Sequence, residues 1–139
     1  MKKIIFICNT YFQLIEAIQL KNTLFYYESV TVVFSDHSRN AENIVERVKS
    51  LGFFEQCYFW SSFEKMKEQK VDSRENRRLL SCEITGKDGY SNPFESNFYD
   101  ELIYYNQLDN LKVVFAELYE KNPQIKVSRF EEGIFSYAD

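Results

Sequence analysis

Residues 4–18 read Ile-Ile-Phe-Ile-Cys-Asn-Thr-Tyr-Phe-Gln-Leu-Ile-Glu-Ala-Ile, and this stretch decides the fold. It opens with a continuous apolar run, which is typical of a strand buried on both faces of a parallel sheet. Apolar residues then recur with helical spacing, at Tyr11, Leu14, Ile15 and Ile18. The stretch therefore predicts a buried strand followed directly by an amphipathic helix.

The same alternation continues along the chain. Apolar or β-branched runs predict further strands at residues 30–34, 56–60, 101–105 and 125–130. Helical spacing predicts helices over residues 41–48 and 111–118, and Gly52 is placed to end the first of these. Ser61-Ser62-Phe63-Glu64-Lys65 offers an N-cap and an acidic first turn for a short helix that ends at about Gln69. No hairpin dipeptide joins consecutive strands, so we predict an α/β, Rossmann-like fold whose mostly parallel sheet has five or more strands and helices on both faces.

One segment does not follow the alternation. Residues 70–93 carry many charges, two glycines and the tripeptide Ser-Asn-Pro, which favours a long mobile loop over a domain boundary. The length of 139 residues fits a single domain, 1–139, with 45% hydrophobic residues to fill a core.

Charge and cysteine content exclude several classes of protein. A formal charge of −4 argues against a nucleic-acid partner and against anchoring on anionic lipid. Cys8, Cys57 and Cys82 are widely spaced, so neither a disulfide framework nor a zinc site is indicated, and a reducing cytoplasm fits best. No apolar stretch approaches the length needed to span a membrane.

Polar side chains follow four of the predicted strands. Because ligands bind outside the carboxyl ends of strands in open α/β sheets, we expect a cleft there. The turn after the first strand contains no glycine, which excludes a dinucleotide fingerprint and a P-loop. The residues at the strand ends are Asn9 and Thr10, Ser35 to His37, Asn106 and Gln107, and Glu131 to Gly133.

Glu131 and Glu132 are candidates for acid/base chemistry. Each carboxylate raises the proton affinity of its neighbour, and Gly133 allows a tight turn after them. One of them could accept the proton of an attacking sugar hydroxyl, which is a poor nucleophile until it is deprotonated. An exposed acidic turn is the competing interpretation, and spacing alone favours it.

The polar residues near the first strand also have two interpretations. Asn9 and Thr10 either contact a ligand or cap the following helix, and the cap is favoured for Thr10. Gln13 either faces the cleft or is solvated. His37 is interpreted as an ordinary loop histidine and Cys8 as an inert packing residue.

Three segments together resemble a known group of enzymes: residues 5–14, Tyr104-Tyr105-Asn106 and Phe130-Glu131-Glu132-Gly133. They resemble bacterial glycosyltransferase family 52 and the related capsular sialyl- and polysialyltransferases. In those families a D/E-D/E-G motif closes the N-terminal half of a two-domain GT-B enzyme. The resemblance implies that Glu131 is the general base, that Glu132 and Gly133 support it, and that Asn9, Thr10, Gln13 and Asn106 line the substrate cleft.

The resemblance also implies the partners. They are a glycan acceptor and a nucleotide-sugar donor, with CMP-sialic acid as the leading candidate, and no metal or other cofactor. In the relatives a C-terminal domain with a His-Pro motif holds the donor, and no His-Pro occurs here. We therefore expect the isolated chain to be inactive, as the acceptor-side part of an inverting enzyme of capsule or lipooligosaccharide synthesis. A cytoplasmic location at the inner face of the membrane, peripheral membrane association of the full enzyme and a homodimer are compatible with this interpretation.

Two alternatives from other classes remain open at this point. One is a non-catalytic α/β module that binds a ligand or regulates another protein. The other is an assembly subunit whose aromatic face pairs with a second copy.

Overall fold

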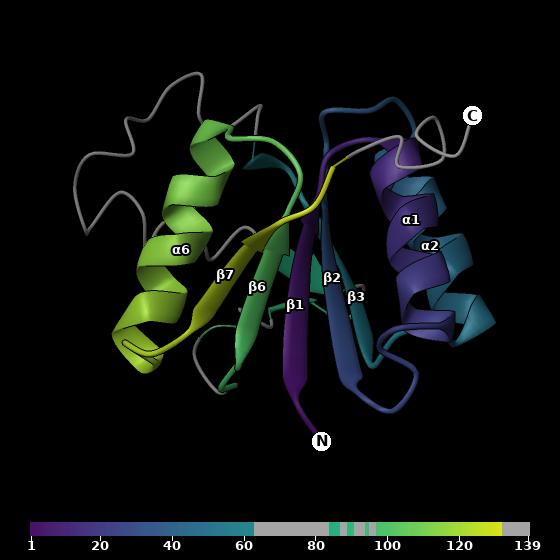
Figure 1. The fold of residues 1–139 in the computed structure, drawn as a ribbon. Coiled ribbons are helices and arrows are strands. Elements are labelled where there is room, and N and C mark those ends of the chain that lie inside the picture. The colour runs from purple at the N-terminus through teal and green to yellow at the C-terminus, as the bar shows by residue number, and fades with distance from the viewer. Residues whose placement is uncertain (63–83, 87–88, 91–93, 95–96, 132–139) are drawn as a thin grey trace.

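Five parallel strands form the centre of the molecule in the computed structural model, which describes residues 1–62, 84–86, 89–90, 94 and 97–131 (Figure 1). A short antiparallel pair extends the sheet beyond β3, and the strand order is β5-β4-β3-β2-β1-β6-β7. The strands are β1 (Lys3–Cys8), β2 (Ser29–Ser35), β3 (Gln56–Trp60), β4 (Ile84–Gly86), β5 (Gly89–Tyr90), β6 (Glu101–Tyr104) and β7 (Lys126–Arg129). The predicted α/β, Rossmann-like fold with a mostly parallel sheet is confirmed.

Helices cover both faces of the sheet. Helices α1 (Tyr11–Asn22) and α2 (Ala41–Leu51) pack on one face, and α6 (Asp109–Lys121) packs on the other (Figure 1). Strand β1 contributes side chains to the core on both faces of the sheet, because successive side chains of a strand point to opposite faces. Phe6 belongs to the core cluster that includes α1 and α2 residues, whereas Ile5 and Ile7 belong to the cluster that includes α6 residues. Since all three are at most 1% exposed, β1 is the buried centre of the fold.

The helix boundaries follow the predicted caps. The hydroxyl of Thr10 accepts a hydrogen bond from the backbone N–H of Gln13 at 3.2 Å, so Thr10 caps α1. Gly52 ends α2 in the left-handed conformation, with φ of 70°. The structure describes the chain only as far as Ser62 in the short helix predicted to end near Gln69. The rest of that prediction lies outside the described residues. Strands β4 and β5 fall within the stretch predicted as a loop, and most of that stretch is likewise not described.

The buried face of α1 differs from the face that the apolar spacing predicted. Tyr11 and Ile15 are 39% and 49% exposed, whereas Gln13 and Glu16 are buried. The prediction was wrong for these two apolar positions, because α1 turns a polar side chain inward. The amide of Gln13 is bound to the ends of two strands, which fixes the rotation of the helix about its axis.

The strand order reverses between β1 and β6. From β1 the chain continues through β2 to β3 on one side, and it later adds β6 and β7 on the other side. The carboxyl ends of β1 and β6 are therefore the position where open α/β sheets usually bind ligands. The residues that follow these two strands are Asn9 and Tyr105-Asn106.

Candidate functional site

Asn9 is the hub of a polar cluster at the reversal point. Its side-chain N–H donates to Oδ1 of Asn106 at 3.0 Å, which bridges the ends of β1 and β6. Its own Oδ1 accepts from the hydroxyl of Ser35 at 2.7 Å and from the amide of Asn110 at 2.8 Å. Asn9 is only 1% exposed, so its side chain holds together the ends of β1, β2 and β6 and the start of α6. We call these residues, with Gln13 and Ser62, the Asn9 hub.

Gln13 makes a second bridge across the reversal point. Its Oε1 accepts a hydrogen bond from the backbone N–H of Asn9 at 2.7 Å, and its Nε2 donates to Oδ1 of Asn106 at 3.4 Å. The structure thus brings together Asn9, Gln13 and Asn106, three of the residues predicted to line a cleft. Thr10 lies beside them as the helix cap. Their contact with a ligand stays a prediction.

Asn110 and Ser62 form a deeper layer that sequence reasoning missed. Both are fully buried, and the amide of Asn110 also lies 3.4 Å from the Ser62 hydroxyl. The Oδ1 atom of Asn110 has no hydrogen-bond partner within the part of the chain that the structure describes. The signal in the sequence was the position of Asn110, on the same helix face as Val113, Val114 and Leu118.

The chemistry available at the Asn9 hub is recognition without proton transfer. Its side chains are amides and hydroxyls, which donate and accept hydrogen bonds but do not titrate in the physiological range. Nearby, His37 is exposed in the turn after β2. Cys8 and Cys57 are buried, and burial raises the pKa of the Cys57 thiol to about 12, so this thiol stays protonated and unreactive.

Glu131 supplies a carboxylate at the same edge of the sheet. The backbone N–H of Phe130 donates to the carbonyl of Tyr104 at 2.9 Å, which continues the parallel pairing of β7 with β6 beyond the last strand residue. Glu131 follows at the carboxyl end, and its side chain is exposed. Only β6 separates β7 from β1, so Glu131 and Asn9 emerge at one edge. Glu132 and Gly133 lie outside the described residues.

Among residues 1–62, 84–86, 89–90, 94 and 97–131, no group of three or more His, Cys, Asp or Glu side chains is arranged to hold a metal ion. Within the same ranges, every helix is too short or too polar to cross a lipid bilayer.

Fold and hub define the class of the protein: an α/β, Rossmann-like protein with a hydrogen-bonded cluster of polar side chains at the reversal point of its sheet. The family model of the alpha-2,8-polysialyltransferases (POLYST) matches residues 4–138, which is nearly the whole chain. The chain therefore belongs to this family, a sialyltransferase-type family of bacteria. Searches of curated proteins and of solved structures gave no match.

Proposed function

We propose that this chain is the acceptor-side, N-terminal domain of an inverting GT-B glycosyltransferase that builds a bacterial capsule or lipooligosaccharide glycan. Family membership makes it sialyltransferase-like, and such an enzyme uses a nucleotide-sugar donor and a glycan acceptor. CMP-sialic acid is the proposed donor, and a donor-binding domain following this one is part of the proposal.

In the proposed reaction Glu131 is the general base. As the acceptor hydroxyl oxygen bonds to the anomeric carbon of the donor, the bond from that carbon to the nucleotide phosphate breaks, and the hydroxyl proton passes to the Glu131 carboxylate. Glu132 and Gly133 support this carboxylate. Asn9, Gln13 and Asn106 orient the acceptor or donor by hydrogen bonds, with Thr10 holding the first turn of α1 beside them.

One observation carries this assignment. Glu131 leaves β7 at the same edge of the sheet at which the Asn9–Asn106 bond crosses the reversal point. A base and a set of neutral hydrogen-bonding groups are thus available on one rim. This is the arrangement that transfer to a neutral hydroxyl requires, because the hydroxyl must be both oriented and deprotonated.

The test uses the full-length enzyme with CMP-sialic acid and a glycan acceptor. Glu131→Gln should lower kcat by about a hundredfold or more, since the amide cannot accept the proton. Glu120→Gln, an exposed change on α6, is the matched control and should leave turnover unchanged. Near wild-type turnover of Glu131→Gln would show that another group is the base.

The neutral character of the Asn9 hub favours one other candidate function. A module that binds a ligand without chemistry needs only the amides and hydroxyls found there. This candidate gains support if the full-length protein binds a nucleotide sugar but neither wild type nor Glu131→Gln transfers it.

A further inference from the structure

One backbone donor fixes the orientation of the Asn106 amide. The backbone N–H of Asn9 can only donate, so the Gln13 atom that lies 2.7 Å from it must be the carbonyl oxygen Oε1. The other branch of the Gln13 amide is then the donor Nε2, and the Asn106 atom that faces it at 3.4 Å must be Oδ1. The same oxygen accepts a hydrogen bond from Nδ2 of Asn9 at 3.0 Å. Asn106 therefore has its carbonyl oxygen turned inward, toward the Asn9 hub.

The other branch of the Asn106 amide, Nδ2, carries two N–H groups that the hub does not use. Both side-chain hydrogen bonds of Asn106 involve Oδ1, and no described residue accepts a hydrogen bond from Nδ2. Asn106 is half-buried at the carboxyl rim of the sheet. A flipped amide would bring Nδ2 against the N–H donors of Asn9 and Gln13. The side chain of Asn106 thus presents donors, and no acceptor, to a ligand at this rim.

A cation lies beside these donors, at the end of β7. The Nε–H of Arg129 donates to the carbonyl oxygen of Tyr105 at 3.4 Å, and this carbonyl belongs to the peptide bond that joins Tyr105 to Asn106. Arg129 is exposed and forms no ion pair with a described residue. Its terminal N–H groups are therefore available to an anion that approaches the rim.

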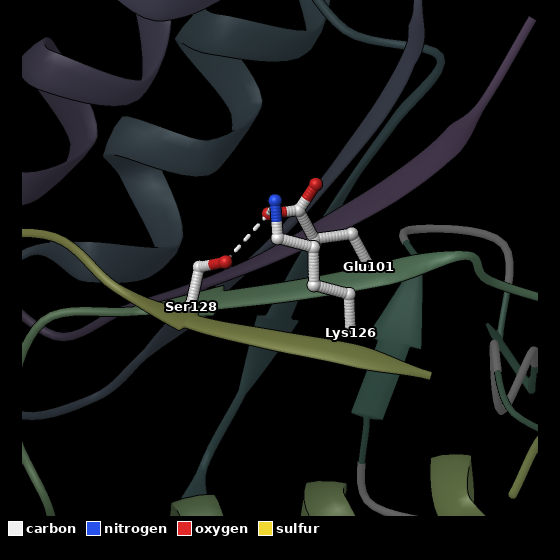
Figure 2. A network of polar contacts seen from close by, with 3 residues as sticks. All are labelled: Glu101, Lys126 and Ser128. Carbon is white, nitrogen blue, oxygen red and sulfur yellow. Dashed lines mark hydrogen bonds and ion pairs between the residues drawn. The ribbon is translucent and has the colours of Figure 1, made fainter. Parts of the chain in front are cut away.

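The other basic residue of β7 has a different environment. Nζ of Lys126 lies 3.9 Å from Oε2 of Glu101, which also accepts a hydrogen bond from the Ser128 hydroxyl at 2.7 Å (Figure 2). The strand register pairs Glu101 with Lys126 at the start of β6 and β7. It pairs Tyr104 with Arg129 at their end. Since the ion pair of Lys126 lies at the amino ends of the strands, Arg129 is the β7 cation that faces the rim.

These groups specify the chemistry of the ligand. Amide donors next to a guanidinium favour an anion with more than one oxygen, and a planar carboxylate matches the fork of N–H groups on arginine. Glu131, exposed at the same edge, would repel such an anion if no cation stood near it. Arg129 precedes Glu131 by two residues and offsets this charge. Asp109 and Lys112, at the start of α6, pair with each other at 3.7 Å and add no net charge.

We propose that Asn106 and Arg129 form a subsite for the carboxylate of an acidic sugar. Its role in transfer rests on the function proposed above. Asn106 follows the paired residue Tyr104 by two positions, and Glu131 follows the partner Arg129 by two positions. A sugar held by its carboxylate at Asn106 is therefore bound at the strand ends from which the proposed base emerges. A sialic acid unit carries such a carboxylate beside its hydroxyls.

The test observes the two side chains directly. The 139-residue chain, labelled with ¹⁵N, is titrated with the methyl α-glycoside of N-acetylneuraminic acid, with the carboxyl methyl ester of that glycoside, and with CMP. The glycoside with a free carboxylate should shift the side-chain NH₂ signals of Asn106 and the Nε–H signal of Arg129. The ester lacks the charge, and CMP carries a phosphate in place of a carboxylate, so both should leave these signals in place.

A charge-matched pair of variants tests the direction of the hydrogen bond. Asn106→Asp keeps an oxygen for the two amide donors of the hub and replaces the outward N–H groups by a second oxygen. It should weaken glycoside binding by about tenfold or more, because two donors become a repelling acceptor. Asn43→Asp adds the same charge at an exposed position of α2 and should bind the glycoside like wild type.

A second pair tests the cation. Arg129→Gln should weaken glycoside binding by about tenfold, since the charge-assisted hydrogen bonds are lost. Arg47→Gln removes the same charge from an exposed position of α2 and should have no effect on binding.

Kinetics of the full-length enzyme then assign the bound carboxylate to one substrate. Asn106→Asp should raise the KM of a sialylated acceptor if the acceptor carries that carboxylate, and the KM of CMP-sialic acid if the donor carries it. Either result supports the subsite. Unchanged values for both substrates would contradict it.

Two results of the titration would overturn the proposal. One is the absence of glycoside-dependent shifts at Asn106 and Arg129 in the wild-type chain, a measurement that needs no variant to fold. The other is an equal response to the ester or to CMP. Neither result bears on Glu131, since no bond is formed in the titration. Conversely, an active Glu131→Gln enzyme would refute the proposed base, while the glycoside would still bind at Asn106.

Discussion

At the scale of single residues, Asn9 has the largest structural role that can be tested. Replacing it with alanine removes the acceptor of the shortest hydrogen bonds from the Ser35 hydroxyl and the Asn110 amide, both fully buried, and breaks the bond to Asn106. A buried donor that loses its main acceptor costs about 1–3 kcal/mol, so Asn9→Ala should lower the free energy of unfolding by roughly 2–4 kcal/mol. Urea unfolding of the chain measures this.

The control for that experiment is Asn43→Ala, since Asn43 is exposed on α2. It should change the free energy of unfolding by less than about 0.5 kcal/mol. Equal effects of the two substitutions would show that the hydrogen bonds of the Asn9 hub contribute little to stability.

The buried thiol of Cys57 should make the folded chain less stable at alkaline pH. Burial raises the pKa of its thiol from 9.0 to about 12. The unfolded chain therefore releases this proton near pH 9 while the folded chain keeps it, so stability is intact below pH 9 and is lost as pH rises toward 12. The expected slope is about 1.4 kcal/mol per pH unit. Cys57→Ala should flatten the pH dependence of the unfolding free energy between pH 9 and 10, measured in urea with a reductant.

A second buried group, the phenol of Tyr99, provides a control for general unfolding at alkaline pH. Burial raises the pKa of its phenol from 10.0 to about 12, so its contribution begins one pH unit higher. Tyr99→Phe should leave the slope between pH 9 and 10 unchanged and reduce the loss above pH 10. Identical slopes for wild type and Cys57→Ala would show that the buried thiol is not coupled to unfolding.

At the scale of elements, the end of α2 depends on one backbone conformation. Gly52 has φ of 70°, and a Cβ atom built there meets no atom within 4 Å. Any loss on Gly52→Ala therefore comes from the backbone alone, about 1 kcal/mol for a left-handed residue with a side chain. Gly52→Asn should lose less, because asparagine tolerates this region. Thermal unfolding of the two variants checks the order, and a stable Gly52→Ala variant would contradict it.

Elements with local signals could be predicted from the sequence. β3 has the predicted bounds, and Thr10 and Gly52 cap the helices they were expected to cap, because strand runs and caps depend on neighbouring residues. The buried side of α1 could not be predicted, since Gln13 is held by a residue 93 positions away. The same holds for Asn110, whose partner Asn9 is 101 positions away in sequence. Whether such a polar side chain is buried depends on which strand ends lie side by side in the fold. The local spacing of apolar residues contains no information about that.

At the scale of the whole molecule, the reversal of strand order determines which face of the sheet each helix covers. α1 and α2 connect strands on one side of β1, while α6 connects β6 to β7 on the other side and packs on the opposite face (Figure 1). The α1-side face of β6 is buried, since Ile103 and Tyr105 belong to the same core cluster as Leu14 and Ala17 of α1, whereas β7 beyond it is mostly exposed. A groove lined by Phe25, Glu101, Ser128 and Phe130 lies on the α1-side face of these two strands.

The same arrangement predicts a gradient of local stability across the sheet. Each β1 residue is paired with β2, and most also pair with β6, whereas β7 pairs only with β6 in the described part of the chain. Opening β7 exposes little apolar surface, since three of its four residues are already exposed. Amides of β7 that bond to β6 should therefore exchange with solvent at least about tenfold faster than those of β1. Hydrogen exchange followed by NMR measures both sets in one sample. Equal protection of β7 and β1 would mean that another part of the protein covers this edge.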